Sequence, residues 1–375
     1  MWRLRPGVAV IAAVSVLLLW WHLPRYQFQD VDVQRLPVIT TQITPEGATI
    51  EYLPGTPKGD GQTYTRTVVV ARQESEDVSW LESSALNVTK AVYVVDKPSL
   101  SPGYEIPRNK GHEAMVYLSY IIDHYDTLSD VSIFVHAHQT AWHNNDLLDS
   151  DMITTIEHLS DAHVTRAGYF NLRCHHEPGC PDWLHLDRPD EELDTHRKME
   201  ERAFSLAVWH ELHPNVPPPR AISQPCCAQF AVSRDRIRAI PRDEYVRYRD
   251  WILNTELGDV FSGRVMEYTW QFLFAGVAEL CPAMHVCYCD GYGVCFGGAE
   301  QFDQWFDLRT EMRRVQAEEV PEKAGVSLEA EEARASAQDM EARLEQLKQD
   351  AFDRGRDPRL RALEVGRPWR EGDGF

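Results

Sequence analysis

The sequence predicts an α/β fold built on a mostly parallel, Rossmann-like sheet with flanking helices. Three short apolar runs rich in β-branched residues, each typical of a buried strand, occur at 67–71, 91–95 and 131–135. Between the second and third runs, the segment 112–125 has apolar residues at helical spacing. The order strand, connection, strand, helix, strand implies parallel pairing with helices that cover the sheet.

After the third strand, the sequence predicts helices and strands in a less regular order. We expect helices over 195–212, from 234 onward and over 263–274, and a strand over 229–232. Beyond residue 300 the composition becomes charged, and 329–349 alternates acidic, basic and alanine residues beside a thin apolar stripe. This pattern is typical of a solvated helix, and a weak coiled-coil contact is the alternative. We therefore expect a globular domain over 65–300 and a charged helical or partly disordered tail over 301–375.

The amino terminus predicts a membrane anchor. An apolar run over 7–23 follows Arg3 and Arg5, and at about 1.5 Å per residue its length of roughly 25 Å is at the short end for a membrane span. The run ends without the small-residue cleavage site of a signal peptide. We expect an uncleaved, single-pass type II signal-anchor with 1–6 in the cytosol, and a cleaved signal is the alternative.

Several features indicate that the domain leaves the cytosol. Segment 24–64 is rich in Pro, Gly and Thr, as expected of a stem between membrane and domain. Asn87 begins the Asn-Val-Thr triplet of a glycosylation site. These features predict a domain in the lumen of the Golgi or endoplasmic reticulum, or at the cell surface.

The eight cysteines all lie between Cys174 and Cys295. In an oxidising compartment an even number of cysteines predicts up to four disulfides, and a zinc site is the alternative. We expect the neighbours Cys226 and Cys227 to join two different partners, because a bond between adjacent residues closes a strained ring.

The charge balance argues against nucleic acid as a partner. The chain has 38 Lys and Arg against 58 Asp and Glu, a formal net charge of −20, whereas phosphate backbones require a clustered basic surface. With 43% hydrophobic residues the chain can bury a sizeable core. The expected ligand is a small molecule or a glycan, and the sequence leaves the oligomeric state open.

Polar residues follow the predicted parallel strands, where such sheets bind ligands. Asp96 follows the second strand directly, and Asn109 and Gly111 open the helix that comes next. Backbone N–H groups at a helix start hold phosphate well. We therefore predict that these three residues bind a cofactor or a nucleotide.

A group of histidines follows the third strand. His136 and His138 are two residues apart, so an extended backbone would direct both side chains to one face, within reach of a single metal ion. His143 or Asp146 would complete the ligand set. The sequence predicts a divalent metal bound by His136, His138 and His143, and the alternative is that the histidines are hydrogen-bonded structural residues.

Five separated motifs resemble the fungal family called domain of unknown function 3431. They occur in order at 109–118, 134–138, 225–234, 248–251 and 263–270. The resemblance covers about residues 65–300. It implies a fungal protein of the secretory pathway or a membrane, and it implies no activity.

The chain is more distantly similar to A-type glycosyltransferases. Asp96 is similar to the aspartate that contacts the nucleotide in that fold, and Asn109 and Gly111 resemble the turn after it. His136 and His138 fall where that family has an Asp-x-Asp metal motif. Imidazoles favour softer metals than carboxylates do. Either the metal differs, the histidines contact the diphosphate directly, or the protein is not a transferase.

Transferase chemistry predicts the remaining roles. The departing nucleotide diphosphate needs a metal or cationic group, and inverting transfer needs a carboxylate to accept the acceptor's proton. Glu267 and Asp250 are the candidates for that base. We thus expect a membrane-anchored, lumenal glycosyltransferase-like domain that uses a nucleotide-sugar donor. The alternatives are a metal-dependent oxidoreductase or hydrolase built on His136 and His138, and a non-catalytic lumenal binding protein.

Overall fold

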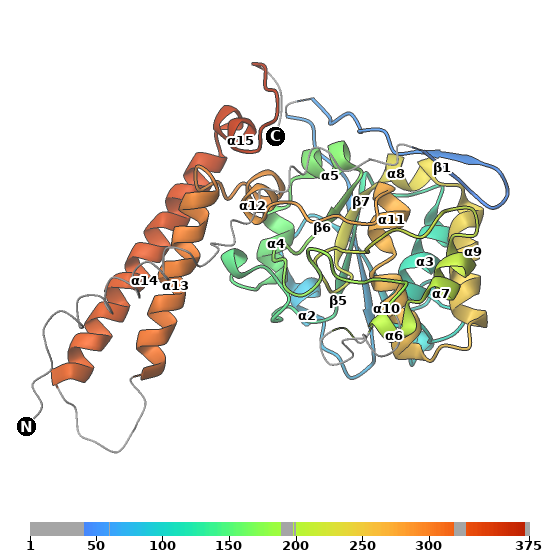
Figure 1. Cartoon of the computed structure of the whole chain (residues 1–375), viewed down its shortest axis with the longest axis horizontal. Helices are drawn as coiled ribbons and strands as arrows, with labels where there is room; N and C mark the ends of the chain where they lie inside the picture. Colours follow the sequence, from blue (N-terminus) through green and yellow to red (C-terminus); the bar gives the residue numbers. More distant parts are fainter. Residues whose placement is uncertain (1–40, 60, 189–197, 199, 319–327, 372–375) are drawn as a thin grey trace, which may run out of the picture. The chain divides into compact units, whose positions relative to one another are not determined.

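The computed structural model describes residues 41–371, except 60, 189–197, 199 and 319–327. A five-stranded sheet in the order β4-β3-β5-β7-β6 forms its centre (Figure 1). The strands are β3 (Arg66–Arg72), β4 (Thr89–Val94), β5 (Val131–His136), β6 (Tyr169–Asn171) and β7 (Phe230–Ser233). The α/β prediction is confirmed, and the three predicted apolar runs are β3, β4 and β5.

The sheet is mixed, so the prediction of a mostly parallel sheet is wrong in part. β3 pairs in parallel with β4 and β5, whereas β7 is antiparallel to both β5 and β6. The reason lies in the connection from β6 to β7. Asn171 at the end of β6 pairs with Phe230 at the start of β7. The chain therefore leaves β6 and enters β7 at the same end of the two strands. No crossover carries the chain back, and β7 must run in the opposite direction.

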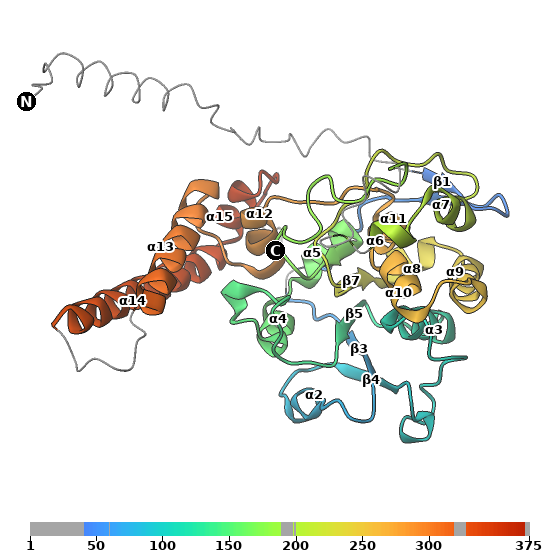
Figure 2. The same ribbon diagram turned by 60° about the horizontal axis from the view of Figure 1, so that its bottom comes forward.

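Helices cover both faces of the sheet. Val69 and Phe134 pack with α3 (Glu113–His124), α9 (Arg242–Asn254), α10 (Asp259–Glu267) and α11 (Trp270–Ala275). Val68 and Ile133 belong to the opposite core, with α2 (Ser79–Ser83), α4 (Met152–His158) and α12 (Met284–Tyr292). Figures 1 and 2 show α3 and α9 on one side of the strands and α4 on the other. Alternate residues of each strand therefore face different cores.

The other short elements connect these layers. They are the 3₁₀ turns η2 (Pro98–Leu100) and η3 (Asp146–Leu148), and helices α5 (Asp161–Ala167), α6 (Glu200–Ala203), α7 (Leu206–Leu212) and α8 (Arg234–Ala239). The helix predicted over 263–274 is two helices, because α10 ends at Glu267 and α11 begins at Trp270. The single helix predicted over 195–212 begins among residues that the structure does not describe. Within its described part the structure has two helices, α6 and α7.

A small hairpin precedes the sheet. β1 (Thr41–Ile43) pairs antiparallel with β2 (Thr49–Glu51). Ile50 and Tyr52 are buried, and the Tyr52 hydroxyl donates to the Leu273 carbonyl oxygen at 3.2 Å. Part of the segment that we expected to be a stem thus packs on the domain. The expected anchor over 7–23 lies outside the described residues, and no described helix is long and apolar enough to cross a membrane.

Three helices follow the sheet domain: α13 (Ala299–Glu318), α14 (Leu328–Gly355) and α15 (Pro358–Glu364). α14 contains the predicted charged helix. α13 and α14 pack against each other, and the Trp305 indole donates to the Leu344 carbonyl oxygen at 3.0 Å. Both side chains are buried with the α4 and α12 core. The thin apolar stripe of α14 therefore packs against other parts of the same chain.

Four disulfides account for all eight cysteines: Cys174–Cys287, Cys180–Cys281, Cys226–Cys227 and Cys289–Cys295. The prediction of four disulfides is confirmed. The expectation that Cys226 and Cys227 join different partners is wrong, because the other six cysteines pair among themselves. The backbone turns sharply beside this bond, with positive φ at Cys227 and Ala228. Sequence spacing carries no information on which thiols the fold brings together.

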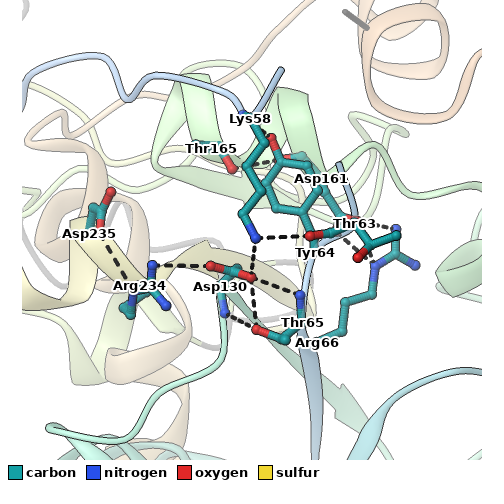
Figure 3. A network of polar contacts seen from close by, with 10 residues as sticks. All are labelled: Lys58, Thr63, Tyr64, Thr65, Arg66, Asp130, Asp161, Thr165, Arg234 and Asp235. Atoms are coloured by element: carbon teal, nitrogen blue, oxygen red, sulfur yellow. Dashed lines mark hydrogen bonds and ion pairs between the residues drawn. The ribbon is translucent and has the colours of Figure 1, made fainter. Parts of the chain in front are cut away.

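Asp130 joins three strand ends at the edge of the sheet where β3 and β5 begin (Figure 3). Its carboxylate accepts hydrogen bonds from the Lys58 ammonium at 2.7 Å and from the backbone N–H and hydroxyl of Thr65 at 2.8 Å each. Arg234, which directly follows β7, lies 3.1 Å away. Burial would raise the pKa of Asp130, but the hydrogen bonds from Lys58 and Thr65 outweigh it and lower the pKa to about 2.

Asp130→Asn should therefore destabilise the fold by about 2–3 kcal/mol, since a neutral amide is a weaker acceptor for these donors. Denaturant unfolding measures the loss. Asp235→Asn is the matched control, because this exposed carboxylate also pairs with Arg234, at 3.7 Å, and should change stability by less than about 0.5 kcal/mol. Equal effects of the two substitutions would contradict the role of Asp130.

The same variants test the pH dependence. Because the pKa of Asp130 is lowered from 3.8 to about 2 in the folded protein, its stabilisation is present above about pH 4 and is lost as the pH falls toward 2. Asp130→Asn should lose less stability over this range than the unchanged protein.

Candidate functional site

A cleft lies at the carboxyl ends of β3, β4 and β5. It consists of two hollows that share His112, Glu113 and His136. The first hollow, of about 300 Å³, is also lined by Arg72, Gln73, Glu76, Asn109, His138 and Asp259. The second, of about 230 Å³, is also lined by Trp142, His143, Cys227, Val260, Arg264 and Glu267. Parallel strands end together here, so their loops converge on one site.

Gln229 couples two of the predicted histidines. Its side-chain oxygen accepts from the backbone N–H of His136 at 3.1 Å, and its NH₂ group donates to His143 Nδ1 at 3.1 Å and to Asn144 Oδ1 at 3.0 Å. A donated bond to Nδ1 assigns the proton of a neutral His143 to Nε2. Gln229 immediately precedes β7, so the start of the antiparallel strand supplies a group that orients the His143 ring and holds the backbone of His136.

Both coupled histidines are neutral near pH 7. Burial lowers the pKa of His136 to about 3, with a smaller contribution from His143. Burial also lowers the pKa of His143 to about 4, with a smaller contribution from Arg173. A neutral imidazole has one acceptor nitrogen and one donor N–H. The two rings, with centroids 5.0 Å apart, can therefore orient a polar ligand without adding charge.

The third predicted ligand, His138, lies apart from this pair. Its side chain is 65% exposed, and its Nε2 lies 3.9 Å from Glu76 Oε1 at the rim of the first hollow. In the described part of the chain, two groups of His, Cys, Asp or Glu have ligand atoms within 4.8 Å of one another, and both contain a disulfide. His136, His138 and His143 are not such a group. The metal site stays a prediction that this arrangement does not fit.

The start of α3 is occupied by a carboxylate of the protein itself. Asp259 Oδ1 accepts from the backbone N–H groups of Gly111 and His112 at 2.6 and 3.2 Å, and His112 Nε2 lies 3.2 Å from Asp259 Oδ2. These are the amides that we expected to hold phosphate. Gly111 has φ 79° and no room for a Cβ, which would lie 2.6 Å from Ile252, so glycine is required for the turn. Asn109 does line the first hollow, whereas Gly111 does not.

Asp96 lies beside the cleft rather than in it. Its Oδ1 accepts from the Glu74 backbone N–H at 2.8 Å, and the neighbouring Val95 lines the first hollow. Asp96 therefore holds the loop that follows β3. This loop carries Gln73 and Glu76 into the first hollow.

Two acidic side chains pair with one arginine at the second hollow. Arg264 Nη1 lies 3.2 Å from Glu200 Oε1 and 3.4 Å from Glu267 Oε2. Glu267 Oε1 accepts from the Cys227 backbone N–H at 2.5 Å. Glu267 is buried, and burial raises its pKa. Burial, with the charge of Glu267 as a smaller cause, raises the pKa of Glu113 to about 8.

Glu113 can therefore hold a proton near neutral pH, and burial raises the pKa of Glu267 in the same direction, as acid–base chemistry requires. Sequence reasoning selected Glu267 but missed Glu113, which resembles an ordinary acid in the first turn of a helix. It also missed Arg264 and the Cys226–Cys227 disulfide as parts of the site. Only the folded arrangement places them beside Glu267.

Asp250 is not part of this constellation. It is exposed on α9 and lines a separate hollow with Glu211, Trp251 and Asn254. We therefore leave Asp250 out of the candidate site.

A family model described as protein of unknown function (DUF3431) matches residues 68–290, more than half of the chain. The protein belongs to the DUF3431 family. The predicted membership is confirmed, whereas the similarity to A-type glycosyltransferases stays a prediction. No curated protein and no solved structure matches the chain. All residues that line the two hollows lie within the part that matches DUF3431.

The raised pKa of Glu113 predicts a stability cost in this DUF3431 domain. Because the pKa rises from 4.5 in the unfolded chain to about 8 in the fold, the protein should lose stability as the pH rises between these values. Glu113→Gln should remove this part of the pH dependence and raise the denaturation midpoint at about pH 8. Glu82→Gln, at an exposed acid in the first turn of α2, is the control and should leave the profile unchanged. A profile for Glu113→Gln that parallels the original would contradict the assignment.

Proposed function

We propose that this DUF3431 protein is a glycosyltransferase that binds a nucleotide sugar in the first hollow and transfers its sugar to an acceptor hydroxyl in the second. The observation that carries the proposal is the division of chemical groups along one cleft. The first hollow alone contains Arg72 and His138, and the second alone contains Arg264 and Glu267. His112, Glu113 and His136 line both hollows, so the two hollows meet at these residues.

This division suits the two requirements of sugar transfer. The bond between the sugar carbon and the diphosphate oxygen breaks, and the electron pair leaves with the diphosphate. Arg72 supplies positive charge on that side, and the imidazoles of His112 and His138 supply polar ring nitrogens. The acceptor oxygen forms the new bond to the same carbon, and its proton passes to the Glu267 carboxylate.

Glu113 has a supporting role in this scheme. With a pKa of about 8 it is protonated near pH 7, so it donates a hydrogen bond to a ligand oxygen and adds no second negative charge beside Glu267. Arg264 and the Cys227 N–H hold the Glu267 side chain from two directions. A base held in this way loses little motion when the acceptor binds.

The same geometry favours a transferase over the metal-dependent alternatives. An oxidoreductase or hydrolase built on the histidines would need three ligand atoms gathered on one ion, and the ligand atoms of His136, His138 and His143 are not all within 4.8 Å of one another. A non-catalytic binding protein would have no use for two carboxyl groups with raised pKa values, because such groups reduce stability.

Activity is tested with the full-length chain and a panel of UDP-, GDP- and CMP-sugars, read by thermal shift and by release of the nucleotide. Glu267→Gln should retain the thermal shift and reduce turnover by about 10²–10⁴-fold, the contribution of a general base. The glutamine side chain still offers an oxygen to the Cys227 N–H, so the fold should persist. Asp250→Asn is the control and should keep full turnover. If no nucleotide sugar shifts the melting temperature, or if Glu267→Gln is fully active, the proposal fails.

We also propose that the domain is lumenal and held by a single-pass type II anchor. Four disulfides support an oxidising compartment, and the apolar run over 7–23 supports the anchor. Protease treatment of intact microsomes should protect the chain beyond about residue 25, and detergent should expose it. A secreted form that lacks the apolar run would contradict the anchor.

A further inference from the structure

Trp142 is an exposed aromatic ring held in a defined position. Among the described tryptophans only Trp142 is exposed, at 69%. The Arg173 guanidinium lies 5.2 Å from its ring centroid, and the His143 ring lies 5.4 Å away. Arg173 is itself buried and donates to the Glu177 carbonyl oxygen at 2.7 Å. A cation over one face fixes the ring while leaving much of its apolar surface in water.

Further apolar groups complete this side of the second hollow. Val260 is 45% exposed, and Cys227 contributes to the disulfide with Cys226. Two of the large exposed hydrophobic side chains of the described residues thus meet in one hollow. Gly263 lies close beside them, because a Cβ there would approach the His112 Cβ to 3.1 Å, a tight contact.

The other side chains that line the second hollow are mostly polar. Glu113 and Glu267 carry carboxyl oxygens, Arg264 carries donors, and His143 presents its ring. The volume of about 230 Å³ is smaller than the roughly 300 Å³ at which typical ligand pockets begin. The second hollow therefore suits a ligand of about one ring, with an apolar face and several hydroxyl groups.

We propose that the second hollow is a sugar-binding subsite in which a pyranose ring lies against Trp142 and directs hydroxyl groups to Glu267 and Glu113. A pyranose presents C–H groups on its faces and hydroxyls around its rim, which matches an apolar wall beside carboxyl groups. C–H groups over an aromatic ring and hydroxyls donated to carboxylates are both favourable contacts. Its assignment as the acceptor subsite rests on the proposed transferase function, whereas sugar binding itself does not.

The placement also specifies the reacting hydroxyl. A ring over Trp142 shares the second hollow with Glu267, a carboxyl group that the Cys227 N–H and Arg264 hold in place. The hydroxyl that donates to Glu267 is then the one that loses its proton. Trp142 contacts the acceptor but takes no part in proton transfer.

The test uses the full-length chain and methyl glycosides of glucose, galactose, mannose and N-acetylglucosamine, with binding measured by saturation-transfer NMR. At least one glycoside should bind, and Trp142→Ala should weaken its binding by about tenfold or more, equivalent to about 1.4 kcal/mol. Trp251→Ala is the matched control, because Trp251 is half-buried in the separate hollow of Asp250. The Trp251→Ala variant should bind the glycoside as well as the unchanged protein does.

Two results would overturn the subsite: none of the four glycosides binds, or Trp142→Ala binds as well as the unchanged protein. Loss of structure is checked by the melting temperature, since an exposed ring contributes little to the core. Trp142→Phe retains an aromatic face and should recover part of the binding. A melting temperature that is unchanged with binding lost supports the subsite.

Nucleotide-sugar binding in the same preparations separates this inference from the proposed function. If a glycoside binds through Trp142 and no nucleotide sugar binds, the transferase proposal fails and the sugar site stands. If nucleotide sugars bind and no glycoside does, the subsite fails and the transferase proposal stands. If Trp142→Ala loses transfer to the glycoside and still hydrolyses the donor, both are supported.

Discussion

The parallel pairing of β3 with β4 on one side and β5 on the other is the constraint on which the site depends. Val68, Val69 and Val70 are completely buried, so β3 has no solvent-exposed face. Its carboxyl end must emerge between those of its neighbours, and the loops after all three strands meet there. At the opposite edge Asp130 ties the start of β5 to Thr65 and to Arg234. The cleft is thus built at the edge that this network leaves open.

The cleft contains two carboxyl groups whose burial reduces the stability of the fold. Glu113 and Glu267 have raised pKa values because burial disfavours their charged forms, and only Arg264 of the described cations is seen to pair with Glu267. Buried titratable groups beside an open hollow are typical of sites that move protons. Most buried positions of the sheet domain hold apolar side chains. At the cleft, titratable groups take such positions beside a hollow that a ligand can enter.

The Cys226–Cys227 disulfide lies just before strand β7 in the chain. The bond was predicted incorrectly, whereas the strand was predicted over 229–232 but not its antiparallel direction. The bond precedes Gln229, which contacts the His136 backbone and the His143 ring, and Cys227 donates its N–H to Glu267. One short segment therefore contacts both the histidine pair and the carboxyl group. The direction of β7 and the position of this segment are linked, because β7 enters the sheet from the edge where the cleft lies.

The sequence by itself determined the α/β class, the strands β3, β4 and β5, the helix α3, the disulfide-rich character and the family. These features depend on local periodicity and on composition, which a single chain displays directly. It also selected Asn109 and the histidines, because residues after parallel strands share an edge, and Glu267 as a carboxylate that sugar transfer would need. Only the tertiary structure decided that Asp259 occupies the amides of α3, that Asp250 lies elsewhere, and that Glu113 and Trp142 line the cleft. Those facts depend on contacts between residues far apart in the chain, where the fold sets distance and burial and no local pattern records them.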